Sequence, residues 1–428
     1  MQGGVIIKKL IKNGIIVNYD CILKGDILID NSEIIKVDKN IESNCEDIVD
    51  AKGNYVFPGL IDAHTHPGLP EDLGFKKDTD DFYTETKAAL KGGTTTIFDF
   101  AEQKKGERLL DALEKRKSRY KNSSGCKYEF HVAVTSVGKD TYEQLREIKD
   151  AGINSIKIYT TYDMKLKHEE ILTLFDYCAK LNITALIHCE EDSIIRYSSK
   201  NTSFPMTRPK EAEENMVNTV INFSRLTGCR VYICHVSSKD SMELIKRAKE
   251  DGLPIIMETC PQYLIFDDSI YNIEQKERTK YILSPPFREV SHKEPLIKAC
   301  LDGTVDLIST DHCAFLFKEH KEKYCLNLEK AAKGMPGIQL RSSIIYNLLV
   351  VNYGLDIKDY VKLLSYNPAK IFGLKDRGYI KPGMKADLVI WSNEKFKVNM
   401  RDIIEGTDYS PYEGFELIGK PLYTNIAL

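Results

Sequence analysis

Tyr55-Val-Phe-Pro-Gly-Leu-Ile-Asp-Ala-His-Thr-His66 is the stretch of sequence that decides the fold. Its apolar residues predict a buried strand that ends at His64 and His66. Because side chains alternate along a strand, histidines two positions apart face one side and can hold one metal ion. The ordinary alternative, favoured for an isolated His-x-His, is that one ring packs in the core and the other caps a turn. Asp62 before the pair and further ligand-type residues later in the chain favour the metal here.

Length, charge and cysteine content restrict the class of protein. A chain of 428 residues with 42% hydrophobic residues fits a barrel-sized domain and a smaller one. The net charge of −3 gives no electrostatic footprint for nucleic acid or an anionic membrane, and no apolar run reaches membrane-spanning length. The 11 cysteines form no C-x-x-C pair. With no secretion signal at the start, they predict reduced thiols in the cytoplasm.

The first part of the chain predicts short strands without helical periodicity. Turn chemistry is expected at Lys12-Asn13-Gly14, Lys24-Gly25-Asp26 and Asp30-Asn31-Ser32. The strands expected between these turns are Val5–Ile7, Gly14–Val17, Asp26–Ile29 and Glu33–Val37. Strand character returns at 386–391. We therefore predict a small β-sandwich domain built from both chain ends, residues 1–54 and 376–428.

From residue 56 onward, strands and helices alternate. Helices are expected near 80–90, 106–121, 141–150, 168–181, 210–227 and 292–301, and again near 338–352 and 357–365. A further helix is expected after His235, running to about Glu250. The strands between them are expected at 94–100, 128–134, 155–159, 184–188, 230–235, 254–258 and 305–310. Eight such strand–helix units are the size and rhythm of a (β/α)₈ barrel, which we predict for residues 55–375.

In a barrel of this kind, function gathers at the carboxyl ends of the strands. The residues expected there are His64, His66, His188, His235 and Asp311. A buried structural histidine is the commoner alternative for each one taken singly. Together on one rim they are typical of a hydrolytic site for a divalent metal, with zinc as the expected ion.

Lys157 lies inside the apolar strand Ser155-Ile-Lys-Ile-Tyr159, where alternation points it into the barrel. A buried ammonium is costly unless it is paired or neutralised. One interpretation is a salt bridge in the barrel mouth. The other is that the neutral amine has reacted with CO₂, and the resulting carbamate bridges two metal ions.

The ordered set of these residues resembles the cyclic amidohydrolases of the amidohydrolase superfamily, and further motifs resemble the hydantoinase/dihydropyrimidinase branch. The resemblance covers nearly the whole chain. Its motifs include Gly92-Gly-Thr-Thr-Thr-Ile-Phe-Asp-Phe100, Lys157-Ile-Tyr-Thr-Thr-Tyr162, His188-Cys-Glu190, His235-Val-Ser-Ser238, Glu258-Thr-Cys-Pro-Gln-Tyr-Leu264, Tyr281-Ile-Leu-Ser-Pro-Pro-Phe-Arg288, Asp311-His-Cys313 and Gly334-Met-Pro-Gly337.

The resemblance implies a role for each matching residue. His64, His66 and Asp311 would bind the more buried metal, and His188 and His235 the other. Lys157, as N6-carboxylysine, would bridge the two. Tyr162 would donate to the developing oxyanion, and the main chain around Ser284 and Lys333 would hold the cyclic amide. The expected cofactors are therefore two divalent metal ions, with zinc first, and CO₂ as the lysine carbamate.

The implied reaction is hydrolytic ring opening of a dihydropyrimidine or a substituted hydantoin to an N-carbamoyl amino acid. A hydroxide bridging the two metals would attack the ring carbonyl, with Asp311 as general base and then acid. The expected partner is a small cyclic amide, and no nucleic acid or membrane is expected. A homotetramer or homodimer is expected, although the chain ends at Leu428, sooner than is usual in the family.

Several departures and rival functions accompany the resemblance. Family members usually carry Asn where this chain has Lys333. The loop at Pro67-Gly68 lies in the region that shapes the preference for the substrate side chain in the family, so the resemblance does not define that preference. Dihydroorotases usually carry Arg after the histidine pair, and allantoinases carry Met-Pro where Asp99-Phe100 stands. Metal-dependent deaminases use a Glu three residues after a strand-end His and no bridging Lys. A non-catalytic, dihydropyrimidinase-related assembly protein is the rival from another class, and it is disfavoured because all the expected ligands are present.

Overall fold

Eight parallel strands form a nearly closed barrel in the computed structural model, which describes residues 8–75, 81–201 and 203–425. They follow one another around the barrel in chain order: β6 (Leu60–Asp62), β7 (Thr94–Glu102), β8 (Lys127–Ala133), β9 (Ser155–Tyr159), β10 (Thr184–His188), β11 (Val231–Ile233), β12 (Ile255–Thr259) and β13 (Leu307–Ile308). The first and last strands meet just beyond their carboxyl ends, where Thr65 and His312 form a parallel bridge. The predicted (β/α)₈ barrel is confirmed.

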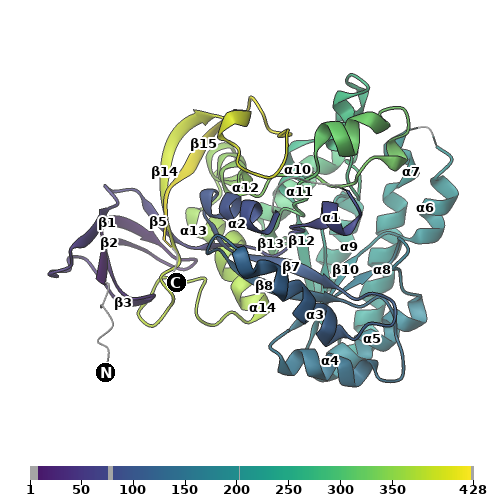
Figure 1. Ribbon diagram of the computed structural model, residues 1–428, viewed down its shortest axis with the longest axis horizontal. Coiled ribbons are helices and arrows are strands. Elements are labelled where there is room, and N and C mark those ends of the chain that lie inside the picture. Colours follow the sequence, from purple (N-terminus) through teal and green to yellow (C-terminus); the bar gives the residue numbers. More distant parts are fainter. Residues whose placement is uncertain (1–7, 76–80, 202, 426–428) are drawn as a thin grey trace.

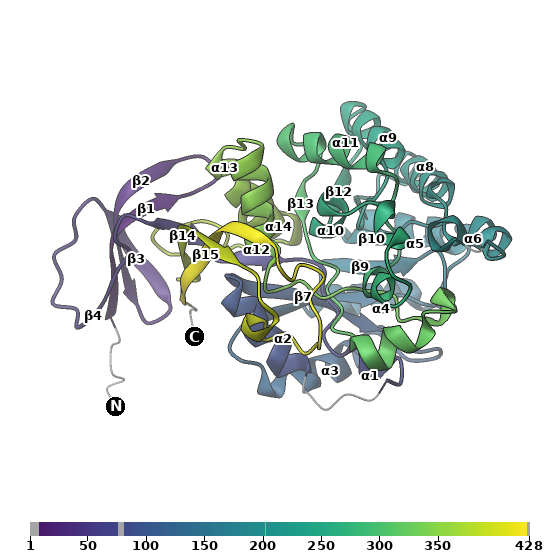
Figure 2. The same cartoon turned by 90° about the horizontal axis from the view of Figure 1, so that it is seen from above.

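Helices surround the barrel, as Figures 1 and 2 show from two directions. The main ones are α2 (Asp81–Lys91), α3 (Leu109–Ser118), α4 (Thr141–Asp150), α5 (His168–Leu181), α8 (Lys210–Thr227), α9 (Lys239–Glu250) and α11 (Val290–Leu301). Shorter ones are α1 (Leu69–Asp72), α6 (Asp192–Ser198), α7 (Phe204–Thr207), α10 (Pro261–Ile265), α12 (Arg341–Ile345), α13 (Ile357–Val361) and α14 (Asn367–Phe372). Over the described ranges, no helix has both the length and the apolar character to cross a membrane.

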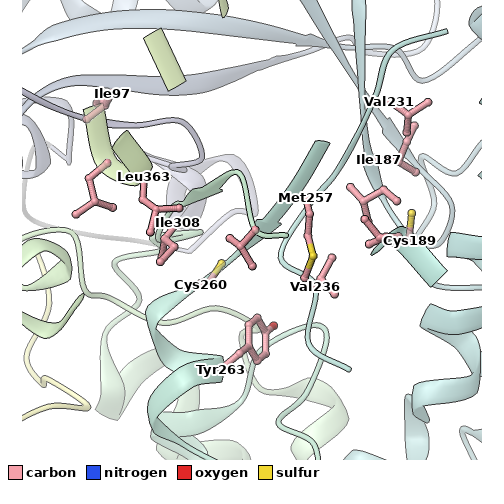
Figure 3. Packing of buried hydrophobic residues seen from close by; sticks show 14 of the residues in the cluster. Ile97, Ile187, Cys189, Val231, Val236, Met257, Cys260, Tyr263, Ile308 and Leu363 are labelled. Carbon is pink, nitrogen blue, oxygen red and sulfur yellow. The ribbon is translucent and has the colours of Figure 1, made fainter. Parts of the chain in front are cut away.

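The two faces of the barrel strands belong to two separate apolar clusters. Phe98, Leu186 and Tyr232 fill the inside of the barrel. The alternate residues pack outward against the helices, and Figure 3 shows part of that cluster, including Ile97, Ile187, Val231, Met257 and Ile308. This alternation fixes which side chains can enter the barrel mouth.

A second sheet combines both ends of the chain, to one side of the barrel (Figure 1). Its order is β15 (Glu416–Asn425), β14 (Leu388–Lys397), β5 (Tyr55–Pro58), β1 (Lys8–Val17), β2 (Ile22–Asp30) and β3 (Glu33–Asp38), with β4 (Asp47–Asp50) also on β1. The prediction that the two ends join is confirmed. All seven strands belong to one hydrogen-bonded sheet.

The stretch from Tyr55 to His66 is not one strand, which corrects the prediction. β5 belongs to the terminal sheet and β6 to the barrel, with Gly59 between them. A Cβ on Gly59 would collide with the side chains of Thr95 and Asp387, so the chain crosses between the two sheets at a point where only glycine fits. The predicted domain boundary at residue 55 remains a prediction, although β5 pairs on the terminal side.

Two predicted turns are wrong, and the third is confirmed. Asn13-Gly14 lies inside β1 at a register shift, where Asn13 has φ 56°. Gly25 lies inside β2, against the backbone of Asp38. Both are irregularities within strands, where glycine and asparagine are also common. Asn31-Ser32 is a true turn between β2 and β3. The predicted strand Val5–Ile7 and the predicted helix start at residue 80 lie outside the described residues.

Candidate metal centre

Five of the six predicted ligand residues lie at or just beyond the carboxyl ends of barrel strands. His64 and His66 follow β6, His188 ends β10, His235 follows β11, and Asp311 follows β13. Lys157 lies within β9 in register with Leu186, a member of the interior cluster, so its side chain also points into the barrel. The structure therefore brings all six residues to one rim.

His64, His66 and Asp311 form the first half of the cluster. Asp311 Oδ1 lies 3.2 Å from His64 Nε2 and 3.1 Å from His66 Nε2. Asp311 has a left-handed backbone, with φ 53°, and its N–H donates to the His64 carbonyl at 2.9 Å. A non-glycine residue in this conformation costs free energy that the surroundings must offset. The loop after β13 is therefore held so that the carboxylate faces the two imidazoles.

His188 and His235 form the second half. His188 Nδ1 lies 3.0 Å from His235 Nε2. The two halves adjoin, because the His64 and His235 rings are 5.5 Å apart at their centroids. Donor atoms of His64, His235 and Asp311 all lie within 4.8 Å of one another, which is close enough to share one ion.

Lys157 is 1% exposed, and its partner is a thiol. Its Nζ lies 3.1 Å from Cys234 Sγ and 5.1 Å from the centre of the Phe100 ring. None of the ion pairs between described residues includes Lys157. The salt-bridged alternative considered from the sequence therefore has no partner within the described ranges.

Glu258 and Glu190 orient the histidines from behind, a role that was not assigned to them from the sequence although both lie in recognised motifs. Glu258 contacts His64 Nδ1 at 2.9 Å, and Glu190 contacts His188 Nε2 at 2.7 Å. Each carboxylate holds a proton on the nitrogen that it contacts. The opposite nitrogen, His64 Nε2 or His188 Nδ1, is left with a lone pair facing the cluster.

Burial sets the charge of the cluster. Burial and the nearby Lys157 ammonium hold the pKa of His64 well below its usual range. Burial also lowers the pKa of His188 and His235, so these rings are neutral near pH 7. Burial alone would raise the pKa of Asp311, but the adjacent His64 and His66 lower it to about 2. Neutral imidazoles and an ionised carboxylate are the forms that bind metal.

Tyr162 lies beside this rim. Its ring centroid is 5.3 Å from that of His188, and its backbone is left-handed at φ 71°. Burial raises the pKa of Tyr162 to about 12, so the hydroxyl keeps its proton and can donate it in a hydrogen bond. Arg208 Nη2 donates to this hydroxyl at 3.3 Å and orients it.

The two remaining predicted substrate residues have weaker support. Ser284 is 8% exposed, and its buried Oγ has no hydrogen-bond partner in the described ranges. Lys333 directs its ammonium to the carbonyl of Glu329 at 2.8 Å. Within the described ranges, neither residue forms a hydrogen bond or ion pair with any of the six candidate ligands, so their roles stay predictions.

A cavity of about 660 Å³ opens beside the cluster. His66 and Phe100 line it, together with Leu69 of α1 and Met164 from the loop after β9. The His66 and Phe100 rings stack at 4.7 Å, which holds that histidine against the wall. A small molecule therefore has room to reach the rim.

Comparisons with known proteins agree with this geometry. The model of the amidohydrolase family matches residues 55–412. The chain is 33% identical to a D-hydantoinase of Geobacillus stearothermophilus, over 97% of this chain and 90% of that protein. It is 32% identical to a D-phenylhydantoinase of Escherichia coli (strain UTI89 / UPEC), over 96% and 91% respectively.

Solved structures of hydantoinases and dihydropyrimidinases have the same fold as this chain. A crystal structure of D-hydantoinase superposes with a TM-score of 0.95 at 33% identity, covering 98% of this chain and 94% of that one. The structure of a dihydropyrimidinase from Brevibacillus agri NCHU1002 superposes with a TM-score of 0.93 at 29% identity and the same coverage.

Proposed function

The chain belongs to the amidohydrolase family, and from that premise we propose that it hydrolyses a cyclic diamide, a dihydropyrimidine or a substituted hydantoin, to an N-carbamoyl amino acid. The observation that carries the proposal is the single rim that holds four histidines, an aspartate and an inward lysine beside a cavity. Relatives similar over nearly the full length are named hydantoinase and dihydropyrimidinase, which supports this substrate class.

The residues fit a pair of divalent metal ions, with zinc as the expected ion. His64, His66 and Asp311 would hold one ion, and His188 and His235 would hold the other. The fit rests on the two ring nitrogens His188 Nδ1 and His235 Nε2, which lie 3.0 Å apart, and on the shared contacts of Asp311 Oδ1. When bound, such ions polarise a carbonyl oxygen and lower the pKa of a water molecule to near neutrality.

Lys157 is proposed to carry the carbamate. Its neutral amine adds to CO₂ and releases one proton, which replaces a buried cation with a carboxylate-like anion that has two oxygens. Burial at 1% exposure favours this change, because a buried ammonium without an anionic partner is strongly disfavoured. The anion would lie between the two histidine pairs and bridge their ions.

The remaining steps use the chain's own residues. Asp311 is ionised and accepts the proton of the attacking water, then returns it to the leaving ring nitrogen. Tyr162 keeps its proton and donates a hydrogen bond to the oxygen that becomes negative as the carbonyl carbon turns tetrahedral. Backbone groups at Ser284 and Lys333 are proposed to hold the ring in place.

Metal analysis and a substrate panel test the proposal together. Protein produced with zinc and bicarbonate should contain two metal ions per chain and should open dihydrouracil or hydantoin. Turnover of allantoin or dihydroorotate in preference to both would redirect the substrate class. Absence of both metal and turnover would support the assembly-protein alternative.

Two further expectations accompany the proposal. The enzyme is proposed to work as a homotetramer or homodimer in the cytoplasm. The oligomeric state can be measured by light scattering of the purified protein, and the location by fractionation of the source cells.

A further inference from the structure

Glu102 places a carboxylate in the cavity beside the metal centre. It is the last residue of β7, two positions beyond Phe100 and four beyond Phe98, both of which belong to the barrel-interior cluster. Alternation therefore directs Glu102 to the same side, one level above Phe100 at the mouth. Both Glu102 and His66 line the cavity of about 660 Å³.

The Glu102 carboxylate has few partners for a partly buried charge. The Tyr159 hydroxyl donates to its Oε1 at 3.2 Å. No other hydrogen bond or ion pair to this carboxylate occurs within the described ranges of the chain. Burial raises the pKa of Glu102 and the charge of Asp72 adds to that effect, whereas His66, Arg116 and the hydrogen bond from Tyr159 oppose it. A carboxylate in such a place favours a ligand that supplies a hydrogen-bond donor or a positive charge.

The two arginines that line the cavity already have partners. Arg116 forms ion pairs with Asp99 and Asp72, both at 2.6 Å. Arg119 is paired with Glu71 and with the same Asp72, also at 2.6 Å. These two arginines are therefore neutralised by carboxylates, and neither is bonded to Glu102.

The three lysines that line the cavity are exposed to solvent. Lys104 and Lys105 are exposed, and the Lys115 side chain is 60% exposed. A charge at an exposed site contributes little to binding because water and salt screen it. An anionic group on a substrate would gain less from these lysines than a cationic group would gain from the partly buried Glu102.

We propose that Glu102 makes this enzyme select cyclic amides whose ring substituent ends in a cation, such as an ammonium group. The inference rests on the proposed ring-opening function. A ring held at the metal centre would extend its substituent past His66 into the cavity, where Glu102 lies on the wall. The products would then be N-carbamoyl derivatives of basic amino acids.

The test compares three hydantoins substituted at the same ring carbon with an aminopropyl, a butyl or a carboxyethyl chain. For the native enzyme, kcat/KM for the aminopropyl compound should exceed kcat/KM for the butyl compound by about tenfold or more, which is the effect of one hydrogen bond to a charged group. The carboxyethyl compound should be the poorest of the three. This comparison needs no variant.

Variants at Glu102 then assign the preference. Glu102→Gln should reduce the ratio of kcat/KM for the aminopropyl compound to kcat/KM for the butyl compound to about twofold or less. Glu102→Leu should make the butyl compound the better substrate. Glu114→Gln is the matched control, because it removes the same charge from an exposed position paired with Lys117 outside the cavity, and it should keep the ratio of the unmodified enzyme. Ratios are compared so that a general loss of activity cancels.

The outcomes separate this inference from the proposed function. Turnover of all three hydantoins without preference, a preference for the carboxyethyl compound, or a ratio unchanged in both Glu102 variants would overturn the role of Glu102 and leave ring opening intact. No turnover of any hydantoin or of dihydrouracil, with two metals bound, would overturn ring opening and the inference together.

Discussion

Replacing Arg208 with leucine should show how much the buried ion pair behind the metal centre contributes to the free energy of unfolding. The Arg208 guanidinium donates to Glu190 through Nη2 at 2.5 Å and through Nε at 3.1 and 3.2 Å. Arg208 is 4% exposed, and Glu190 is fully buried. Glu190 in turn holds His188 Nε2. Arg208→Leu therefore leaves a buried carboxylate without its counter-ion.

The expected loss in the free energy of unfolding is about 3–5 kcal/mol, the usual cost of removing one partner from a buried ion pair. Equilibrium urea denaturation of the metal-free protein at pH 7 measures it without a contribution from metal binding. The cost arises from the uncompensated charge, so a second substitution that removes this charge should recover part of it. Arg208→Leu combined with Glu190→Gln keeps an acceptor for His188 and should recover about 2 kcal/mol.

The same pair sets a pH dependence. Arg208 and His188 keep the pKa of Glu190 below its usual range despite burial, which by itself would raise it. The stabilisation from an ionised Glu190 is thus fully present above the unfolded pKa of 4.5 and is lost as pH falls. The difference in the free energy of unfolding between the native protein and Arg208→Leu should therefore become smaller below that pH. The reasoning would be refuted if the free energy of unfolding of Arg208→Leu lay within about 1 kcal/mol of the native value. It would also be refuted if the double variant were no more stable than Arg208→Leu alone.

Three further predictions concern other parts of the molecule. Glu258→Gln should weaken metal binding by about 10–100-fold, measured by competition with a chelator, and an unchanged affinity would contradict its orienting role. Gly59→Ala should lower the free energy of unfolding by about 1–3 kcal/mol in thermal denaturation, because its Cβ would collide with Thr95; an unchanged melting temperature would contradict the tight crossing. Burial lowers the pKa of Lys321 to about 7, so the unfolded chain binds the extra proton between about pH 7 and 10. The stability of the native protein relative to Lys321→Met should therefore rise with pH in that window, by up to about 1.4 kcal/mol per unit, and a flat difference would count against a neutral buried amine.

The barrel, and the gathering of the candidate ligand residues at one rim, could be predicted because local patterns determine them. Alternation within β9 directs Lys157 inward, and in the structure it is in register with Leu186 of the interior cluster. Strand ends must gather at one rim once the barrel closes, so the sequence alone predicts that His188 and His235 lie close together. The 3.0 Å distance between their ring nitrogens agrees with that expectation.

Other features depend on contacts between distant segments, which local patterns do not contain. Asn13-Gly14 has turn composition, but pairing with β2 and β4 makes it an irregularity inside β1. The division of Tyr55–His66 into two strands depends on which sheet each half joins. The Glu102 carboxylate faces a cavity that residues of α1, α3 and the loop after β9 also line. Only the folded chain brings these segments together.

The most direct test of the central claim is the loss of dihydrouracil or hydantoin absorbance on adding protein produced with zinc and bicarbonate, beside Lys157→Ala produced in the same way. We expect turnover and two metal ions per chain for the native protein. The Lys157→Ala variant should lose turnover and at least one of the ions, and the native chain alone should carry the mass of one added CO₂. Equal turnover in the two proteins would contradict the carbamate bridge, and a native protein with neither metal nor turnover would contradict the account as a whole.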